Sequence, residues 1–450
     1  MTNCDSDLKS NQIISIYLDY AATTPIDKRV VEKMLPFLWS EAGYYANAAS
    51  ESHVLGKRVA AAIEEARNQV ASLLNVDPKT LVFTSGATES INLALKGAAT
   101  FYKRFGNHII TCQTEHRATL DTCAQLAREG FEISYLKTRP DGLIDLNQLI
   151  TTLKPETRLV SIMLVNNETG VLQDIASLAA ITRERGIIFH VDAAQAVGKI
   201  PIDLQQLPID LMSFSAHKVY GPKGIGALYI GDNPKIRLQA QIHGGGQERG
   251  LRAGTLATHQ ILGMGAAFAI AKTEMLAESQ RLQTYRAKLW SAISALPGVY
   301  LNGHNTHHVP GILNICFADI EKEVLLTSLA DIAVSSASAC AATSLEPSHV
   351  LRAMGLKSIM AHRSIRFSMG RFTTENDIDK TIAGIQKMLS IGSRSSNSSR
   401  SSDLSRSSNS VSSGLDLSDA PNALNSVGPS ISSNSLSSLS SSNGFNKLNA

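Results

Sequence analysis

Between residues 13 and 389 the chain alternates short runs of apolar and β-branched residues with longer stretches whose apolar residues recur at helical spacing. Glycine and proline separate the two kinds of segment. The stretch 175–185 is typical of the helices, and the predicted strands include 81–85, 108–112, 159–165, 186–191 and 210–215. This alternation predicts an α/β fold with a mainly parallel sheet covered on both faces. Ligands of such sheets bind beyond the carboxyl ends of the strands.

A different pattern follows residue 265. A long helical stretch leads into two predicted strands, 311–317 and 333–337, and then into a predicted helix, 375–389. From residue 392 the chain is rich in Ser and nearly devoid of aromatic residues, so that burial cannot offset the entropy of ordering it. We therefore expect a second, smaller α/β region and then a disordered Ser-rich tail over 392–450.

Composition narrows the class of protein. The 450 residues are enough for more than one domain, and the net charge of +3 is spread too evenly to indicate nucleic acid or a membrane as a direct partner. No apolar run approaches the roughly 18 residues of a membrane span, and the first residues show no targeting pattern. Five cysteines without paired spacing favour a reducing compartment. We expect a cytoplasmic protein.

Lys218, in the run S-F-S-A-H-K-V-Y-G-P-K-G, is the strongest candidate for chemistry. A lysine after an apolar strand is usually a surface residue. Here, however, Asp192 ends another predicted strand and Cys340 lies in a third segment, S-S-A-S-A-C. A desolvated lysine amine forms Schiff bases, and pyridoxal phosphate requires one, together with an anion beside its ring nitrogen. The three residues together indicate chemistry on that carbonyl cofactor.

Other residues suit the same cofactor. The junction S-G-A-T-E-S, with Thr88, offers free N–H groups and a hydroxyl to a phosphate, although an ordinary helix cap is an alternative. Asp192 would pair with a pyridinium, or would cap a helix. Gln195 follows at a distance suited to a neighbouring phenolic oxygen, and Ser215 and His217 would add phosphate donors. His116 alone is most simply a structural histidine.

Cys340 is surrounded by small residues, which are typical of an exposed, mobile loop and not of a core. An accessible cysteine can act as a thiolate nucleophile. Cys112 and Cys316 instead lie within strand patterns and are predicted to be buried.

With these residues in place, the chain resembles the cysteine desulfurases of the NifS/IscS type, within the class-V aminotransferase group. The matching segments run in order over residues 16–390; they are Y-L-D-Y-A-A-T-T-P, F-T-S-G-A-T-E-S-I-N-L-A, T-E-H-R-A, V-N-N-E-T-G, H-V-D-A-A-Q, S-F-S-A-H-K-V-Y-G-P-K-G, G-G-G-Q-E-R-G-L-R-A-G-T, S-S-A-S-A-C and S-I-R-F-S-M-G-R-F-T-T. The resemblance implies the fold type I of pyridoxal-phosphate-dependent transferases, with a mainly parallel seven-stranded sheet. It implies a large cofactor-binding domain over 29–265, a small domain over 266–391 that bears the Cys340 loop, and an N-terminal segment, 1–28, that joins the small domain.

The resemblance also implies roles for individual residues. Lys218 would hold pyridoxal phosphate as a Schiff base and move the substrate α-proton, with His116 stacked on the ring and assisting. Asp192 would hold the ring nitrogen and Gln195 the phenolic oxygen, while Asn167 and Arg366 would position cofactor and substrate carboxylate. The implied phosphate ligands are the Ala87 backbone, Thr88, Ser215 and His217, with Thr255 from the second subunit of a homodimer.

The implied reaction converts L-cysteine to L-alanine and leaves the sulfur as a persulfide on Cys340. In the family this sulfur passes to an iron–sulfur scaffold protein and to carriers for tRNA thiolation, and Cys340 would transiently ligate a [2Fe–2S] cluster shared with the scaffold. Two alternatives stay open: a selenocysteine lyase or other class-V aminotransferase, and a sulfur-relay scaffold without turnover.

The sequence departs from the family pattern at three places. Ala46-Asn47-Ala48 replaces G-N-P, and Ala337 replaces a glycine before the cysteine, which stiffens the entry of that loop. The Ser-rich tail stands where the family has a short scaffold-docking segment. None of these changes removes a reactive group.

Overall fold

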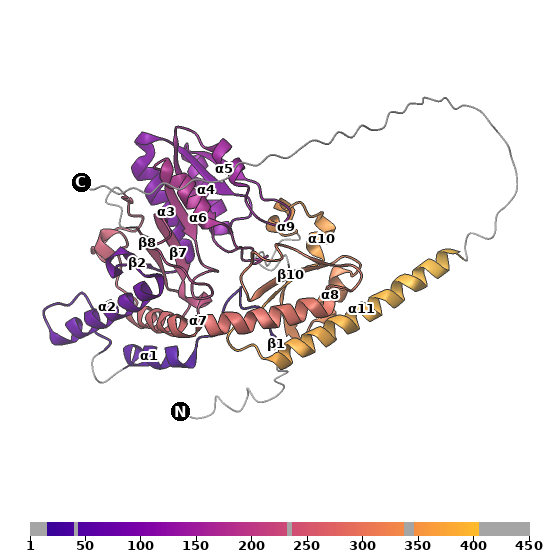
Figure 1. The fold of residues 1–450 in the computed structure, drawn as a ribbon. Coiled ribbons are helices and arrows are strands. Elements are labelled where there is room, and N and C mark those ends of the chain that lie inside the picture. Colours follow the sequence, from indigo (N-terminus) through magenta and orange to yellow (C-terminus); the bar gives the residue numbers. More distant parts are fainter. Residues whose placement is uncertain (1–15, 40–43, 232–235, 337–345, 405–450) are drawn as a thin grey trace, which may run out of the picture. The chain divides into compact units, whose positions relative to one another are not determined.

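The computed structural model describes residues 16–39, 44–231, 236–336 and 346–404 (Figure 1). The chain divides into two compact units, 1–396 and 397–450. The described part of the second unit is the end of one long helix. All of the sheets among the described residues lie in the first unit.

A seven-stranded sheet forms the centre of the first unit (Figure 1). Its strands are, in spatial order, β2 (Leu81–Thr84), β8 (Gly226–Ile230), β7 (Leu211–Ser215), β6 (Ile188–Asp192), β5 (Thr157–Met163), β3 (His108–Cys112) and β4 (Glu132–Leu136). β8 is antiparallel to both neighbours, and the other pairs are parallel. The prediction of a mainly parallel seven-stranded sheet is therefore confirmed, and the five strands predicted from the sequence lie where they were expected.

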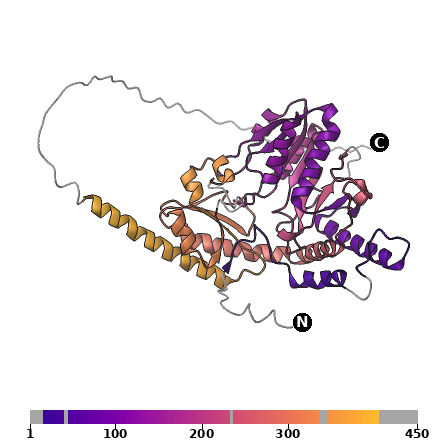
Figure 2. The ribbon, with the colours of Figure 1, turned by 180° about the vertical axis from the view of Figure 1, so that it is seen from behind.

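Alternate strand residues face opposite layers of helices, as the pleat requires. Phe83 belongs to a buried cluster with residues of α2 (Val54–Leu74), α5 (Leu146–Thr152), α6 (Ile175–Glu184) and α7 (Thr258–Ile293). Its neighbour Val82 belongs to a second cluster, with α3 (Ala87–Tyr102) and α4 (Arg117–Arg128). The sheet is thus covered on both faces, and the two sides can be compared in Figure 1 and Figure 2.

A second sheet lies C-terminal to the first in sequence. It is antiparallel, in the order β12 (Ser335–Ser336), β13 (Ser364–Ser368), β10 (Ile312–Phe317) and β9 (Val299–Leu301). Its core includes Leu289 of α7 and Ile378 of α11 (Glu375–Leu404). Leu18 belongs to the same core, since β1 (Ile16–Tyr17) pairs with β11 (Ile332–Ala333). The remaining helices are α1 (Lys28–Leu38), α8 (Lys322–Ser328), α9 (His349–Ala353), α10 (Ser358–His362) and the 3₁₀ turns η1 (Pro78–Thr80), η2 (Lys103–Phe105), η3 (Ala216–Lys218) and η4 (Glu248–Gly250).

Helix α11 runs past residue 391, where the disordered tail was expected to begin. Over 392–404 the structure therefore differs from that prediction. An established helix extends at little cost, because each added residue gains one hydrogen bond without a new nucleation step. The rest of the predicted tail, 405–450, lies outside the described residues.

No helix in the described part of the chain is both long enough and apolar enough to span a membrane.

Candidate active site

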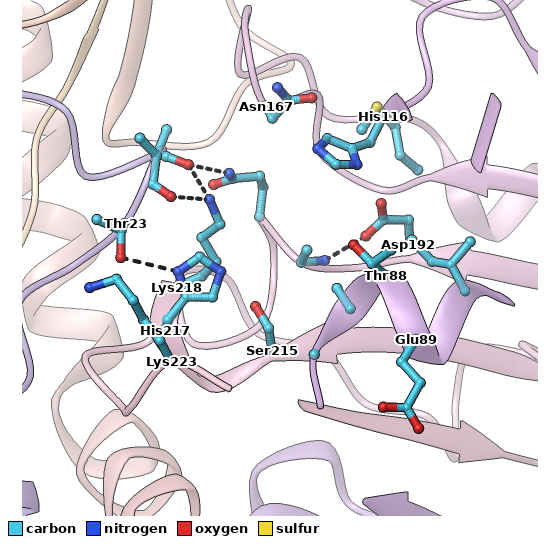
Figure 3. A pocket seen from close by; sticks show the side chains of 18 of the residues that line it. Thr23, Thr88, Glu89, His116, Asn167, Asp192, Ser215, His217, Lys218 and Lys223 are labelled. Atoms are coloured by element: carbon cyan, nitrogen blue, oxygen red, sulfur yellow. Dashed lines mark hydrogen bonds between the residues drawn. The ribbon is translucent and has the colours of Figure 1, made fainter. Parts of the chain in front are cut away.

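A cavity of about 560 Å³ opens at the carboxyl ends of the central strands (Figure 3). This is the edge of the sheet at which the sequence predicts a ligand site. Ten of the predicted residues line it together: Ala87, Thr88, His116, Asn167, Asp192, Gln195, Ser215, His217, Lys218 and Arg366.

The N-terminus of α3 faces this cavity. Gly86 occupies the N-cap position and makes no side-chain hydrogen bond, so the helix begins without the side-chain cap that was the alternative interpretation. The first N–H groups of a helix have no partner within it, and they bind anions well. Nearby, Ser215 Oγ is buried and has no hydrogen-bond partner among the described residues. Both features suit a phosphate.

Asp192 is buried at the end of β6. Its Oδ1 accepts a hydrogen bond from the N–H of Ala194 at 2.9 Å, but no helix begins there, so helix capping does not account for it. Burial raises the pKa of Asp192, and electrostatic interactions with His116 and Lys218 oppose that rise. A protonated ring nitrogen would supply the positive partner that such a buried carboxylate requires.

His116 has two structural roles. It is the N-cap of α4, where its Nδ1 accepts a hydrogen bond from the N–H of Ala118 at 3.1 Å, and its ring also lines the cavity (Figure 3). Burial lowers the pKa of His116. The ring is therefore neutral near pH 7, and because Nδ1 accepts, the proton is on Nε2.

Lys218 lies at the end of η3, directly after β7. Its Nζ donates hydrogen bonds to the carbonyl oxygens of Ala21 at 2.5 Å and Ala22 at 2.6 Å (Figure 3). The adjacent His217 contacts Thr23 Oγ1 through Nδ1 at 3.1 Å. Burial, reinforced by lysine charges, lowers the pKa of His217 to about 4, so this ring is a neutral hydrogen-bonding group.

Arg366 reaches the cavity from β13 of the second sheet. One Nη donates to the Asn167 carbonyl oxygen at 2.8 Å and the other to Asp19 Oδ1 at 2.7 Å. Its buried Nε, and Oδ1 of Asn167, have no hydrogen-bond partner within the described part of the chain. These two unsatisfied groups are suited to a substrate carboxylate and a polar ring substituent.

Thr255 does not line this cavity. It is exposed beside a smaller cavity, of about 180 Å³, which Asn47, Ala48 and Gln247 also line. The Ala46-Asn47-Ala48 departure thus lies beside Thr255 and not beside Lys218. Cys340 and Ala337 lie outside the described residues, so the expectations for them stay predictions.

The sequence analysis did not identify two further polar residues beside the site. Lys199 donates from Nζ to Gln195 Oε1 at 2.5 Å. Glu115 is buried next to His116, with Oε1 accepting the Met163 N–H at 2.8 Å. Glu115 belongs to the segment T-E-H-R-A, and Lys199 follows the segment H-V-D-A-A-Q by four residues, but nothing in these patterns indicates that either side chain turns inward. In the described ranges no group of three or more His, Cys, Asp or Glu side chains is placed to hold a metal ion.

The family model for class-V aminotransferases matches residues 16–381. This chain belongs to that family. Among curated proteins it is 57% identical over 376 residues to the cysteine desulfurase IscS of Escherichia coli strain K12 / DH10B. The aligned residues make up 84% of this chain and 93% of that relative. Among solved structures it is similar to a NifS-like protein, with a TM-score of 0.77 and 36% identity over 84% of this chain and all of that one. It is also similar to SspA in complex with cysteine, with a TM-score of 0.71 and 37% identity over 80% of this chain and all of that one.

Class-V aminotransferases depend on pyridoxal phosphate. The cavity fits this group, because its residues provide a lysine amine, a buried carboxylate and an uncapped helix N-terminus beside an unsatisfied hydroxyl. These groups would suit the aldehyde, the ring nitrogen and the phosphate of the cofactor, respectively.

Proposed function

We propose that this chain is a cysteine desulfurase, which converts L-cysteine to L-alanine and transfers the sulfur to Cys340 as a persulfide. The observation that supports it best is the convergence of Lys218, Asp192 and Arg366 in one cavity. The 57% identity to IscS and the similarity to a structure solved with cysteine agree with this activity.

The cavity residues would divide among the parts of the cofactor. Lys218 Nζ would bind it covalently, Asp192 would pair with its ring nitrogen, and Gln195 would contact the phenolic oxygen. The N-terminus of α3, at Ala87 and Thr88, would hold the phosphate together with Ser215 and His217. When bound, pyridoxal phosphate supplies an electron sink for the electron pair released at the substrate α-carbon.

The substrate is oriented by its carboxylate. Arg366 is buried and is held by Asp19 and the Asn167 carbonyl, so its guanidinium is fixed before substrate arrives. The unsatisfied Nε and the neighbouring amide of Asn167 face the same space. The α-carbon would then lie close to Lys218 Nζ, which moves the α-proton, and to the neutral ring of His116, which assists.

Sulfur transfer needs an accessible thiolate. The three cysteines that the structure describes, Cys112, Cys123 and Cys316, are all buried. Burial raises the pKa of Cys112 and of Cys123 to about 12, which makes both poor nucleophiles at neutral pH. This leaves Cys4 and Cys340, and the small-residue loop favours Cys340. Its thiolate attacks the substrate sulfur and forms the persulfide. The bond between that sulfur and the substrate β-carbon breaks, its electron pair stays on the carbon, and the carbon takes up a proton to give alanine.

The sulfur on Cys340 then passes to acceptors, of which we propose an iron–sulfur scaffold protein and carriers for tRNA thiolation, with Cys340 as a transient cluster ligand. We further propose that 29–265 form the cofactor-binding domain and 266–391 the small domain. The pairing of β1 with β11 supports the assignment of the N-terminal segment, 1–28, to the small domain.

A homodimer completes the proposal, with Thr255 contributed to the partner's phosphate site. Thr255 is exposed and lies away from the cavity of its own chain, as expected of a residue that serves a second copy. Large apolar side chains are exposed near α1 and the start of α2, among them Trp39 (83% exposed), Tyr45 (69%) and Val54 (70%). Such side chains are typical of a surface that another subunit covers.

The test is mass spectrometry of the protein after exposure to L-cysteine. We expect one added sulfur atom on Cys340 and an equivalent of alanine. Cys340→Ala should keep the visible absorbance of bound cofactor yet lose at least about 100-fold in sulfide release, because its nucleophile is absent. Lys218→Ala should lose both the visible absorbance and the sulfide release.

Cys316→Ala is the matched control, because that thiol is buried against Met360 and should not take up sulfur. Full sulfide release by Cys340→Ala would contradict the proposal.

A further inference from the structure

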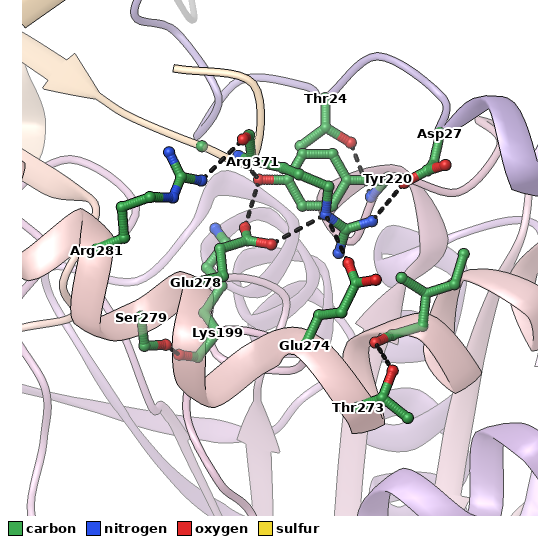
Figure 4. Close-up of polar contacts among 12 residues, drawn as sticks. Thr24, Asp27, Lys199, Tyr220, Thr273, Glu274, Glu278, Ser279, Arg281 and Arg371 are labelled. Atoms are coloured by element: carbon green, nitrogen blue, oxygen red, sulfur yellow. Dashed lines mark hydrogen bonds and ion pairs between the residues drawn. The ribbon is translucent and has the colours of Figure 1, made fainter. Parts of the chain in front are cut away.

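Lys199 is joined to Lys218 through a short chain of hydrogen bonds. Its Nζ donates to Gln195 Oε1 at 2.5 Å, and Gln195 Nε2 donates to the Ala21 carbonyl oxygen at 2.8 Å. That same oxygen accepts from Lys218 Nζ at 2.5 Å. The Lys199 backbone is fixed in turn, since Ser279 Oγ of α7 donates to its carbonyl oxygen at 2.5 Å (Figure 4).

The chemistry of the ammonium group determines which way the Gln195 amide faces. In its protonated form Lys199 has three donors and no acceptor, and this form requires the amide oxygen of Gln195 to face it. The amide NH₂ must then face the opposite side, toward the Ala21 carbonyl and Lys218. The Ala21 carbonyl can only accept and so favours the same orientation; without Lys199 the amide would keep that bond but lose the donor that holds its oxygen.

The charges around Lys199 are mostly positive. Lys218 of η3 and Arg366 of β13 act on it as cations, and the anion that opposes them is Glu278 of α7. Glu278 is already engaged: it pairs with Arg371 Nε at 3.0 Å and accepts a hydrogen bond from Tyr220 Oη at 2.8 Å (Figure 4). Burial and the two cations lower the pKa of Lys199 to about 7.

We propose that Lys199 is a positioning residue of the active site, which orients Gln195 and whose charge disfavours protonation of the nitrogen at Lys218. The inference rests on the proposed function, because it concerns the lysine that would bind the cofactor. Asp192, His116 and His217 also act electrostatically on Lys218, and they are the same in every variant below.

The experiment is a pH titration of the visible absorbance of the cofactor-bound enzyme. Lys199→Met removes the charge and the donor, so the absorbance transition should move about one pH unit higher, because a nearby cation no longer opposes protonation. Lys199→Arg keeps the charge and should titrate within about 0.3 units of the parent. In steady-state kinetics Lys199→Met should lose about tenfold in kcat, with KM changed less than about twofold. The small change in KM is expected because Lys199 does not line the cavity in which Arg366 would bind the substrate carboxylate.

Lys272→Met is the matched control, an exposed lysine of α7 bonded to Ser72, and should titrate as the parent does. If Lys199→Met does not accumulate as folded protein, Lys199→Gln keeps a polar head without the charge and should show the same upward shift. Parental titration in both uncharged variants would overturn this inference while leaving the desulfurase activity intact. A parent enzyme without cofactor absorbance or alanine release would instead overturn the proposed function.

Discussion

At the scale of single residues, burial sets the protonation states around the cavity. Glu115 is buried, with one carboxyl oxygen on the Met163 N–H and the other without a partner among the described residues. Burial raises the pKa of Glu115 well above its ordinary value, and the charge of Asp192 adds to the rise. The side chain therefore keeps its proton to higher pH than an exposed glutamate does, which disfavours a second negative charge near Asp192.

This protonation state predicts a pH-dependent stability difference. In the unfolded chain Glu115 ionises near its ordinary pKa of about 4.3, whereas in the folded chain it keeps its proton to higher pH. Folding stability from this group therefore falls as the pH rises between those two values, by up to about 1.4 kcal/mol per pH unit. Glu115→Gln keeps the acceptor for Met163 and cannot ionise.

We expect urea unfolding at pH 5 and pH 8 to show Glu115→Gln gaining stability relative to the parent as the pH rises. A stability difference that is the same at both pH values would mean that Glu115 is ionised in the folded protein.

At the scale of elements, a buried ion pair holds a glycine-rich loop against the central sheet. This loop is the segment G-G-G-Q-E-R-G-L-R-A-G-T, which ends at Thr255. Glu248 of η4 pairs with Arg67 of α2 at 2.7 Å and accepts the N–H of Phe83 in β2 at 2.8 Å. Glu248 and Arg249 both have left-handed backbone, with φ of 47° and 58°. The carboxylate of Glu248 thus joins η4 to α2 and β2, which lie 181 and 165 positions away at Arg67 and Phe83.

Glu248→Ala should destabilise the protein by about 3 kcal/mol, because it leaves the Arg67 guanidinium buried without its counter-charge. Glu64→Ala removes the other, exposed partner of Arg67 and should change stability by less than about 0.5 kcal/mol. Thermal unfolding of the two variants side by side measures the contrast. Equal effects would show that Glu248 is no more important to the loop than a surface charge.

At the scale of the whole molecule, the position of Thr255 predicts an active site shared between two chains. The residue is exposed on its own chain and lies apart from Lys218, and an apolar surface is available for a second copy. A twofold dimer of this kind would bring each Thr255 to the cavity of the other protomer.

Mixed dimers test this arrangement. Lys218→Ala and Thr255→Trp should each be nearly inactive alone, but a purified dimer containing one chain of each should recover about half of the parental activity, because one of its two sites is intact. If Thr255 instead serves its own chain, neither site of the mixed dimer is complete and no activity returns. Sedimentation of the parent should give twice the mass of one chain.

Much of the fold and part of the site follow from local patterns. The strands β3, β5, β6 and β7 are predictable because a strand buried on both faces is rich in apolar and β-branched residues. Their parallel arrangement places whatever follows each strand at one edge of the sheet, where His116, Asn167, Asp192 and Lys218 line one cavity. The helical end of α11 beyond residue 391 was not predicted, because Ser-rich composition indicates low helix propensity and not where an existing helix stops.

By itself, the sequence determined which residue types stand at the carboxyl edge of the sheet and hence which cofactor chemistry they suit. Only the tertiary structure decided what those side chains contact: the Ala21 carbonyl on Lys218, the Lys199 ammonium on Gln195, and Asp19 on Arg366, a residue 347 positions away. The physical reason is that strand and helix patterns report burial and periodicity along the chain. Every residue has a backbone carbonyl, so the sequence does not indicate which one a buried cation will contact. That contact depends on how separate elements pack.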